Sequence, residues 1–413
     1  MTDEAFAGRR LKQCNAIVAP APVAEVGDGT LNGTRLVVKD VFVDNDRDPT
    51  CGSKVHADWM SGTAEILTRL RGAGAEVVAY ANLHEWGVGT SSLVTATGPI
   101  RNPHDPERIA GGSSGGSAVA VALGAVDAAI GTDAGGSIRI PAACCGIVGL
   151  KPTHSIVPTQ GFFTDGSRVD HIGPMARSVG MTRRLFEVLS GSRVALIEPG
   201  SLRLGIAREF FFTDLDEAVA AAVERAIALL GDVVRDAREV VVEGAERSRR
   251  AMPALVLAGL LDRIAPRFEE RLADFQPDTQ ELFVRARAID DAARAEARQI
   301  QRDVTRGFAD VFEVVDVVVT PTLSAPPPRI EDPVIELPSG RRSIDQAYVP
   351  LNAPMNHAGV PALSLPCAEL GDGTTISITL TAAREREDVV LAVGEALEEK
   401  LGRRYVDRGA VSD

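Results

Sequence analysis

The chain carries between residues 111 and 141 the stretch GGSSGGSAVAVALGAVDAAIGTDAGGSIRIP. Within it, an apolar run rich in alanine and valine separates two segments rich in glycine and serine, residues 111–117 and 131–137. Glycine lets the backbone take positive φ and approach a ligand closely. Serine supplies a hydroxyl where the backbone has left room. The pattern therefore predicts two loops that present hydroxyl groups to a site.

The first of these segments does not match a nucleotide-binding loop. It lacks the GxxxxGK[ST] spacing of a phosphate-binding loop, and no lysine follows it. It also lacks the GxGxxG spacing of a dinucleotide site. A phosphate site is therefore not favoured.

Ser137 is expected where a helix begins. A serine in that position is most often only a helix cap. The functional interpretation is that backbone N–H groups converge beside its hydroxyl and form an oxyanion hole, reinforced by the helix dipole. The N–H groups concerned are those of Ala134, Gly135, Gly136 and Ser137. Ser137 on its own does not decide between a cap and a nucleophile.

A serine nucleophile needs a base, because its hydroxyl is a poor nucleophile at neutral pH. None of the six histidines lies in a recognisable catalytic motif, and the GxSxG elbow of α/β-hydrolases is missing. Lys39 is the other candidate. It lies among Val37, Val38 and Val41, where loss of hydration would lower its pKa and leave a neutral amine. The alternative is that Lys39 pairs with Asp40 or extends its charged end from a strand to water.

Four segments follow one another in a fixed order: KD at 39–40, GGSSGG at 111–116, GTDAGGSIRIP at 131–141 and CGIVGLKPT at 145–153. This series resembles the amidase-signature family. The family includes fatty acid amide hydrolase, malonamidase, indoleacetamide hydrolase and the A subunit of the tRNA-dependent amidotransferase. The resemblance is strong over residues 27–180 and moderate over 310–400, whereas residues 190–310 resemble no one member.

The resemblance implies a triad of serine, serine and lysine. The acylating serine falls on Ser137, the bridging serine, preceded by a cis peptide bond, on Ser113, and the base on Lys39. Lys39 takes a proton from Ser113, which takes one from Ser137. The oxyanion hole falls on residues 134–137, and Gly87 falls on a substrate-contact position. The resemblance implies neither a metal nor a cofactor.

We expect an α/β fold with a mixed, mostly parallel central sheet covered by helices on both faces. Apolar runs at residues 36–43 and 76–81, with helical spacing at 63–74 between them, give a βαβ rhythm. We expect a single amidase-signature domain over residues 1–413. Its parts are a signature core at about 27–180, a variable helical substrate region at about 190–310 and a C-terminal part of strands and helices at about 311–405.

Composition and charge narrow the classes of partner. The formal net charge is −13, and an acidic surface repels phosphate backbones, so nucleic acid is not an expected partner. Five cysteines without CxxC spacing argue against a disulfide framework and against a metal site. No stretch has the pattern of a signal peptide or the length of a membrane span. We therefore expect a cytoplasmic protein without membrane contact.

The leading hypothesis is an amidase that hydrolyses a small-molecule carboxamide to a carboxylate and ammonia through an acyl-enzyme on Ser137. Lys39 comes early in the chain, as in the short indoleacetamide-hydrolase-like members, so aryl, indolyl and small aliphatic amides are the expected substrates. A homodimer is a further possibility for the assembly of the chain.

Two other hypotheses remain. An A-type component of an amidotransferase would need partner chains and a glutamine pocket, and the short segment before Lys39 counts against it. A catalytically silent binding protein on the same scaffold is disfavoured by the intact Lys39, Ser113 and Ser137.

Overall fold

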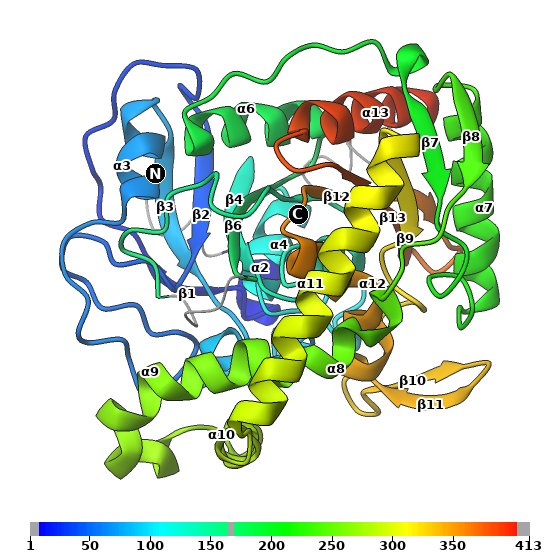
Figure 1. The fold of residues 1–413 in the computed structure, drawn as a ribbon. Helices are drawn as coiled ribbons and strands as arrows, with labels where there is room; N and C mark the ends of the chain where they lie inside the picture. The colour runs from blue at the N-terminus through cyan, green and yellow to red at the C-terminus, as the bar shows by residue number, and fades with distance from the viewer. Residues whose placement is uncertain (1–7, 164–168, 403–413) are drawn as a thin grey trace.

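The structure, a computed structural model, describes residues 8–163 and 169–402. A mixed sheet runs through the molecule, with eleven strands in this described part of the chain (Figure 1). In spatial order these strands are β1 (Ile17–Pro20), β3 (Glu76–Ala81), β2 (Arg35–Lys39), β4 (Ala128–Asp133), β6 (His171–Ala176), β5 (Val148–Lys151), β12 (Ala362–Glu369), β13 (Thr375–Ala382), β9 (Val317–Pro321), β7 (Arg203–Ile206) and β8 (Asp236–Glu239). A separate hairpin consists of β10 (Val334–Leu337) and β11 (Gly340–Ser343).

The sheet is mixed, as expected, but the prediction that it is mostly parallel is wrong. The parallel pairs are β3–β2, β2–β4, β9–β7 and β7–β8. The antiparallel pairs are β1–β3, β4–β6, β6–β5, β5–β12, β12–β13 and β13–β9. The βαβ rhythm seen near the N-terminus does not extend along the chain. Residues 370–374, for example, join β12 to β13 and are too few for the crossover that a parallel pair requires.

Helices cover both faces of the sheet, as expected (Figure 1). One face carries α3 (Glu65–Gly72), α6 (Val179–Ser190), α7 (Glu217–Gly231) and α13 (Glu387–Lys400). The other carries α4 (Gly115–Ala122), α5 (Arg139–Cys145) and α12 (Ile344–Ala358), with the long α11 (Asp291–Val314) packed outside α12. Short elements elsewhere are α2 (Arg9–Gln13), η1 (Glu85–Gly87), η2 (Pro199–Ser201) and η3 (Ala245–Arg247).

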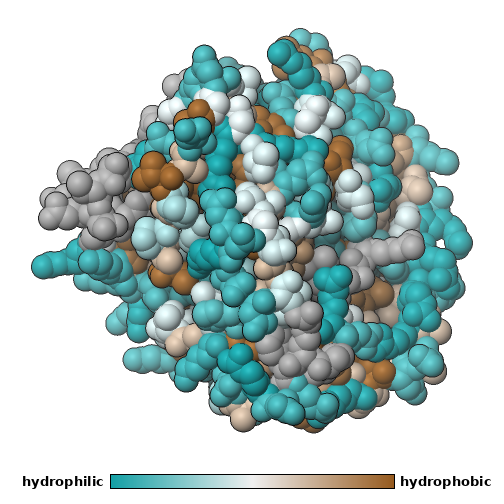
Figure 2. Space-filling model, turned by 90° about the vertical axis from the view of Figure 1, so that its left-hand side faces the viewer, coloured by the Kyte–Doolittle hydropathy of each residue, from teal (hydrophilic) through white to brown (hydrophobic). Residues whose placement is uncertain are grey.

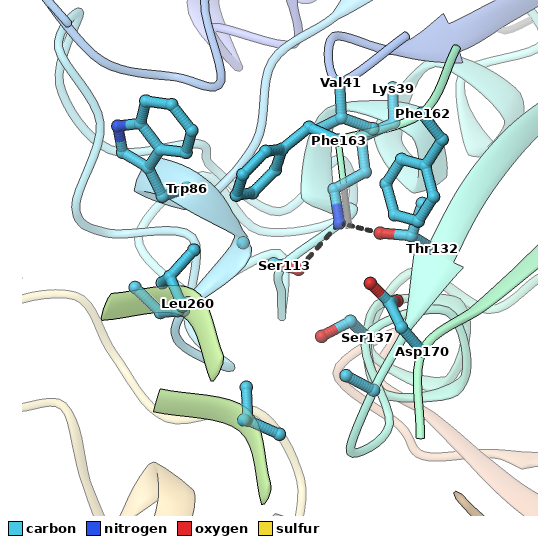
Figure 3. Close-up of a pocket in the computed structure, with 14 residues that line it drawn as sticks. Lys39, Val41, Trp86, Ser113, Thr132, Ser137, Phe162, Phe163, Asp170 and Leu260 are labelled. Atoms are coloured by element: carbon cyan, nitrogen blue, oxygen red, sulfur yellow. Dashed lines mark hydrogen bonds between the residues drawn. The ribbon is translucent and has the colours of Figure 1, made fainter. Parts of the chain in front are cut away.

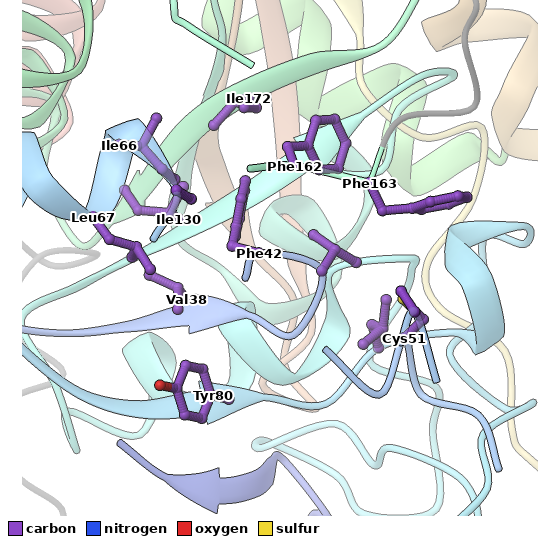
Figure 4. Packing of buried hydrophobic residues seen from close by; sticks show 14 of the residues in the cluster. Val38, Phe42, Cys51, Ile66, Leu67, Tyr80, Ile130, Phe162, Phe163 and Ile172 are labelled. Carbon is purple, nitrogen blue, oxygen red and sulfur yellow. The ribbon is translucent and has the colours of Figure 1, made fainter. Parts of the chain in front are cut away.

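The alternation of strand residues explains why this sheet is buried on both sides. In β2, Leu36 and Val38 belong to the hydrophobic cluster under α3 and α6, whereas Val37 points into the cluster under α4 and α5. In β4, Ile130 joins the first cluster and Ala129 the second. Figure 4 shows the first cluster, where Ile66 and Leu67 of α3 lie against Val38 of β2 and Ile130 of β4.

The register of β2 and β4 positions the functional site. These strands are parallel, with Val38 opposite Ile130. Their carboxyl ends therefore meet at one edge of the sheet, where Lys39 ends β2 and Asp133 ends β4. β6 runs the other way beside β4 and pairs His171 with Asp133. The chain just before β6 therefore comes to the same edge.

A group of short helices forms a rim at this edge, below the sheet in the view of Figure 1. We define the rim as residues 248–287: α8 (Ser248–Met252), the π-helical turn η4 (Pro253–Leu257), α9 (Ala258–Phe268), η5 (Glu269–Asp274) and α10 (Pro277–Arg287). Buried Glu85 ties the rim to the core, since its carboxylate accepts hydrogen bonds from Ser53 Oγ at 2.7 Å and from the Gln276 N–H at 2.9 Å. Beside it, the Trp86 ring packs against Phe275, with ring centroids 6.0 Å apart.

The surface is mostly hydrophilic, with apolar residues scattered in small groups over the face shown in Figure 2. Among the helices of residues 8–163 and 169–402, none is long and apolar enough to cross a membrane.

Candidate active site

Lys39 is buried at the end of β2 and lies against two hydroxyl groups. Its Nζ is 2.8 Å from Ser113 Oγ and 2.7 Å from Thr132 Oγ1, and the side chain is 1% exposed (Figure 3). Burial lowers the Lys39 pKa to about 8, while the carboxylates of Asp170 and Asp133 act in the opposite direction. The neutral amine is therefore more accessible near physiological pH than it is in a solvent-exposed lysine.

Ser113 follows a cis peptide bond, Gly112–Ser113, as the resemblance implies. Its segment precedes α4, a helix of small residues that is buried on all sides. The N–H of the next residue, Ser114, donates to the carbonyl oxygen of Ser137 at 3.2 Å. This bond joins the two glycine-serine loops directly. Ser113 and Ser137 line the same pocket.

Ser137 does not act as a helix cap in this structure. Among the residues that the structure describes, no helix N–H donates to its hydroxyl, and the residue that precedes α5 is Ile138. The Asp133 carboxylate takes that role, because it accepts the N–H groups of Gly136 at 2.7 Å and Ile138 at 3.2 Å. The Ser137 side chain instead points into the pocket below Lys39 and Ser113 (Figure 3). Within the described residues, no hydrogen bond joins the hydroxyls of Ser113 and Ser137.

A fully buried ion pair fixes this loop from behind. Arg139 Nε and Nη2 each lie 3.0 Å from a carboxylate oxygen of Asp133, and both side chains are 0% exposed. Arg139 also donates to Asn356 Oδ1 at 2.6 Å and to the Asn352 carbonyl at 3.0 Å, which connects the loop to α12. Burial opposes the charged form of Asp133, but the Arg139 guanidinium and the Asn356 amide hold its pKa well below the usual range.

The expected oxyanion-hole donors differ in their availability. The N–H of Gly136 is already bonded to Asp133. In the described part of the chain, the N–H groups of Ala134, Gly135 and Ser137 have no protein acceptor. Gly136 has a φ of 120°, which favours glycine, and an added Cβ there would lie 2.8 Å from the Asn352 side chain. The tight loop thus leaves three N–H groups beside the Ser137 hydroxyl.

The pocket has an inner and an outer part. The inner cavity, of about 40 Å³, is lined by Lys39, Val41, Trp86, Gly87, Val88, Ser113, Thr132, Ala134, Ser137, Phe162, Phe163, Asp170, Val256 and Leu260. The outer cavity, of about 380 Å³, shares Gly87 and Ser137 and extends along the rim to Arg249 and Arg285. Gly87 faces the Lys39–Ser113 contact, since a Cβ at this position would be 3.6 Å from Ser113 Oγ. Gly87 and Ser137 thus line both cavities.

Sequence reasoning missed two polar residues of the inner cavity, Thr132 and Asp170. Thr132 lies inside the second glycine-serine segment and holds Lys39 from the side opposite Ser113. Asp170 precedes β6 and reaches the cavity because β6 pairs with β4. Of these two residues, only Thr132 could have been identified from the sequence, because it stands next to Asp133 in the second glycine-serine segment. Among the described residues, no cluster of His, Cys, Asp and Glu is arranged to hold a metal ion.

Comparison with known proteins identifies the family of this chain. A family model described as Amidase matches residues 6–391. The chain is 33% identical to the A subunit of the glutamyl-tRNA(Gln) amidotransferase of Methanospirillum hungatei JF-1, over 86% of this chain and 90% of that protein.

Solved structures give the same result. A crystal structure of an amidase superposes with a TM-score of 0.90 and 31% identity, covering 97% of this chain and 95% of the other. A component of a vestigial protein complex linked to the origins of an s-triazine catabolic enzyme, bound to an inhibitor, has a TM-score of 0.87 and 28% identity over 96% and 94%. The family and the fold that the sequence segments indicated are thereby confirmed.

Proposed function

The chain belongs to the amidase family, an enzyme family that acts on amide C–N bonds, and on that premise we propose that it hydrolyses a carboxamide through an acyl-enzyme on Ser137. The observation that carries this proposal is the contact of 2.8 Å between the buried Lys39 Nζ and Ser113 Oγ, beside Ser137 in one cavity. A hydroxyl nucleophile requires a base, and this is the buried amine that can serve as one.

The acylation step follows from this arrangement. Neutral Lys39 takes the proton of Ser113, and Ser113 takes the proton of Ser137 once the Ser137 hydroxyl turns toward it. Ser137 Oγ attacks the carbonyl carbon, and the oxygen that becomes negative faces the free N–H groups of Ala134, Gly135 and Ser137. The C–N bond then breaks as the proton returns through Ser113 to the nitrogen, and ammonia leaves.

Deacylation repeats the sequence with water as the nucleophile. Water loses its proton through the same relay and attacks the ester carbon on Ser137. The tetrahedral intermediate releases the carboxylic acid, Ser137 Oγ recovers its proton through the relay, and the acid ionises to the carboxylate by giving its proton to solvent. The three side chains thus return to their starting states without any other reactant.

The cavity lining supports an amidase that acts on a free small-molecule amide. Apart from Lys39 and Asp170, the lining is apolar or small, and it includes Trp86, Phe162 and Phe163, of which the last two have their rings beside the Lys39 side chain (Figure 3). Such walls fit a compact apolar acyl group, as in aryl and indolyl acetamides or small aliphatic amides.

The relatives support a second candidate, the glutamine-hydrolysing component of an amidotransferase. The Methanospirillum hungatei protein carries an amidotransferase description and is matched over 90% of its length. In that case the amide is the side chain of glutamine, the ammonia passes to a further substrate, and partner chains are required. The relatives therefore favour the amidotransferase, whereas the apolar lining favours the free amidase.

One experiment separates these candidates. The purified chain is incubated alone with phenylacetamide, indole-3-acetamide, propionamide and glutamine, and released ammonia is measured, with Ser137→Ala as the matched control. We expect turnover of at least one apolar amide by the parent protein only. Turnover restricted to glutamine would select the amidotransferase, and ammonia release by neither protein from any amide would support the silent binding protein instead.

A further inference from the structure

Thr132 is the second hydroxyl that contacts the proposed base. Its Oγ1 lies 2.7 Å from Lys39 Nζ, while Ser113 Oγ lies 2.8 Å from the same nitrogen. Figure 3 shows both contacts, with Nζ between the two hydroxyl groups. Thr132 is 6% exposed and Lys39 is 1% exposed, so little water competes for this contact. The mechanism proposed above uses Ser113 and gives Thr132 no role.

The place of the Thr132 hydroxyl is fixed by the fold. Thr132 lies in β4, beside the strand that carries Lys39, and pairs with Ile172 of β6. The Ser114 hydroxyl also holds its backbone, because it donates to the Thr132 carbonyl at 3.2 Å and accepts from the Thr132 N–H at 3.3 Å. A threonine side chain is branched at Cβ and has few rotamers. The hydroxyl therefore keeps its place when the lysine changes its charge.

The charge of Lys39 decides which way its hydrogen bonds run. A charged lysine has three N–H donors and no acceptor, so both hydroxyl groups then accept. A neutral lysine has two N–H groups and one lone pair, and the relay requires this lone pair to receive the Ser113 proton. Rotation about the Cε–Nζ bond would turn an N–H toward Ser113 instead. A second acceptor at a fixed place opposes this rotation, because it binds one of the two N–H groups.

We propose that Thr132 is a positioning residue, which accepts one N–H of neutral Lys39 and thereby aims the lone pair at the Ser113 hydroxyl. This inference rests on the amide hydrolysis proposed above. In this role Thr132 acts on the base and takes no proton itself. Without its hydroxyl the reaction keeps the same steps, but the amine is correctly oriented for a smaller part of the time.

The test removes the hydroxyl and then restores it. Thr132→Val keeps the branch at Cβ, which suits a strand, but offers Lys39 no acceptor. Thr132→Ser restores an acceptor at the same carbon. Circular dichroism checks the fold of each variant, and Thr132→Ala replaces Thr132→Val if the valine variant misfolds. The measured quantities are kcat and KM against pH on phenylacetamide, or on glutamine if the amide panel selects it.

The matched control is Thr182→Val. Thr182 is fully buried, and its hydroxyl donates to the Ser178 carbonyl at 2.9 Å. It belongs to α6 rather than to the described lining of either cavity. Its substitution therefore removes one buried threonine hydroxyl without touching the base, and the variant should match the parent in kcat and KM.

We expect Thr132→Val to lower the plateau value of kcat/KM by about tenfold to a hundredfold, less than the loss of the base itself. The loss should appear in kcat with little change in KM, because the hydroxyl orients the lysine and is not proposed to bind substrate. Thr132→Ser should keep more of the activity than Thr132→Val.

The pH profile separates positioning from a merely structural role. A hydrogen bond that Lys39 donates favours its charged form, so removal of the acceptor lowers the lysine pKa further and moves the rising limb to lower pH. A variant that only loosens the site would admit water, weaken the desolvation that lowers this pKa, and move the limb to higher pH. The ionisable groups around the lysine, which are Asp133, Asp170, Cys51 and His84, are the same in all variants.

An unchanged plateau in Thr132→Val, or a rising limb that stays or moves to higher pH, would overturn the inference and leave the proposed function in place. Ammonia release from no amide by the parent protein would overturn both. A lower plateau with the limb at lower pH, restored in part by Thr132→Ser, supports the inference.

Discussion

The signature core around the two serines and the rim of residues 248–287 both line the pocket, but they are built differently. In the core, Lys39, Ser113, Asp133 and Arg139 are at most 1% exposed and bonded across separate elements. The rim contributes mostly apolar side chains on short helices, and the ion pairs that join it to α11, Arg294–Asp262 and Arg250–Glu296, are open to solvent. From this comparison we predict that the core holds the chemistry in place, while the rim selects what reaches it.

The largest effect on activity is expected when the proposed nucleophile in the core is removed. Ser137→Ala should abolish turnover, because it removes the hydroxyl that we propose as the nucleophile, which belongs to the same loop as the free N–H groups. The fold should be unchanged, since the Ser137 side chain makes no hydrogen bond within the described structure. Ammonia release and circular dichroism measure the two effects. Full activity in a correctly folded Ser137→Ala protein would refute the assignment.

The next largest effect is expected at the base. Lys39→Arg keeps a positive charge but cannot supply a neutral amine, so kcat/KM should fall by about 10²–10⁴-fold, nearly as far as in Lys39→Ala. If Lys39 served only as a cation, the arginine variant would keep most of its activity. Retention of more than about a tenth of the parent kcat/KM would therefore show that another group is the base.

The pH profile of the parent enzyme checks the same assignment. The lysine acts as a base only when neutral, and burial lowers its pKa to about 8. Activity should therefore rise with pH through about 8 and reach a plateau above it. A profile that is flat between pH 6 and pH 10 contradicts a lysine base.

Stability offers a third test, which compares a core ion pair with a rim ion pair. Arg139→Leu leaves the Asp133 carboxylate buried without its partner, so we expect a loss of about 3–5 kcal/mol in the free energy of unfolding. Arg294→Leu removes the solvent-exposed pair with Asp262, and we expect less than about 1 kcal/mol. Urea unfolding of both variants measures the difference. Losses of equal size would remove the distinction between core and rim.

The smallest effect is expected in the rim. Val256 lines both cavities from the turn η4, and Val256→Ala should raise KM for an apolar amide about threefold to tenfold, the contribution of one or two buried methylenes. Val284→Ala on α10 is the matched control, because this valine is 65% exposed. The kcat of both variants should match the parent. A fall in kcat with unchanged KM would mean that the rim positions the triad.

Much of the site could be predicted because its residues follow one another in motifs. The segments that contain Lys39, Ser113 and Ser137 indicated the family, and the structure brings the first two into contact and the third into the same cavity. Their catalytic roles stay predictions. The cap that seemed the simplest role for Ser137 is supplied by Asp133, four residues earlier, through its side chain.

The rest depended on contacts that the sequence does not show. Asp170 reaches the cavity only through the antiparallel pairing of β6 with β4, and the expectation of a mostly parallel sheet did not include that pairing. In the rim, helical periodicity predicts helices but does not say which face lines a cavity. Val256 lies in a π-helical turn, where the usual spacing does not hold.

The carboxylate of Glu85 has a consequence for protein engineering. It is buried in the core and bonded to the backbone N–H of Gln276, so the rim is anchored to the scaffold through a main-chain atom that any non-proline residue supplies. A graft of residues 248–287 between related enzymes would therefore have to retain Glu85, avoid proline at position 276 and preserve the core contacts of Leu260, Ile264 and Phe275. Substrate range would then be exchanged by a graft of contiguous sequence, without any change to the hydrolytic machinery.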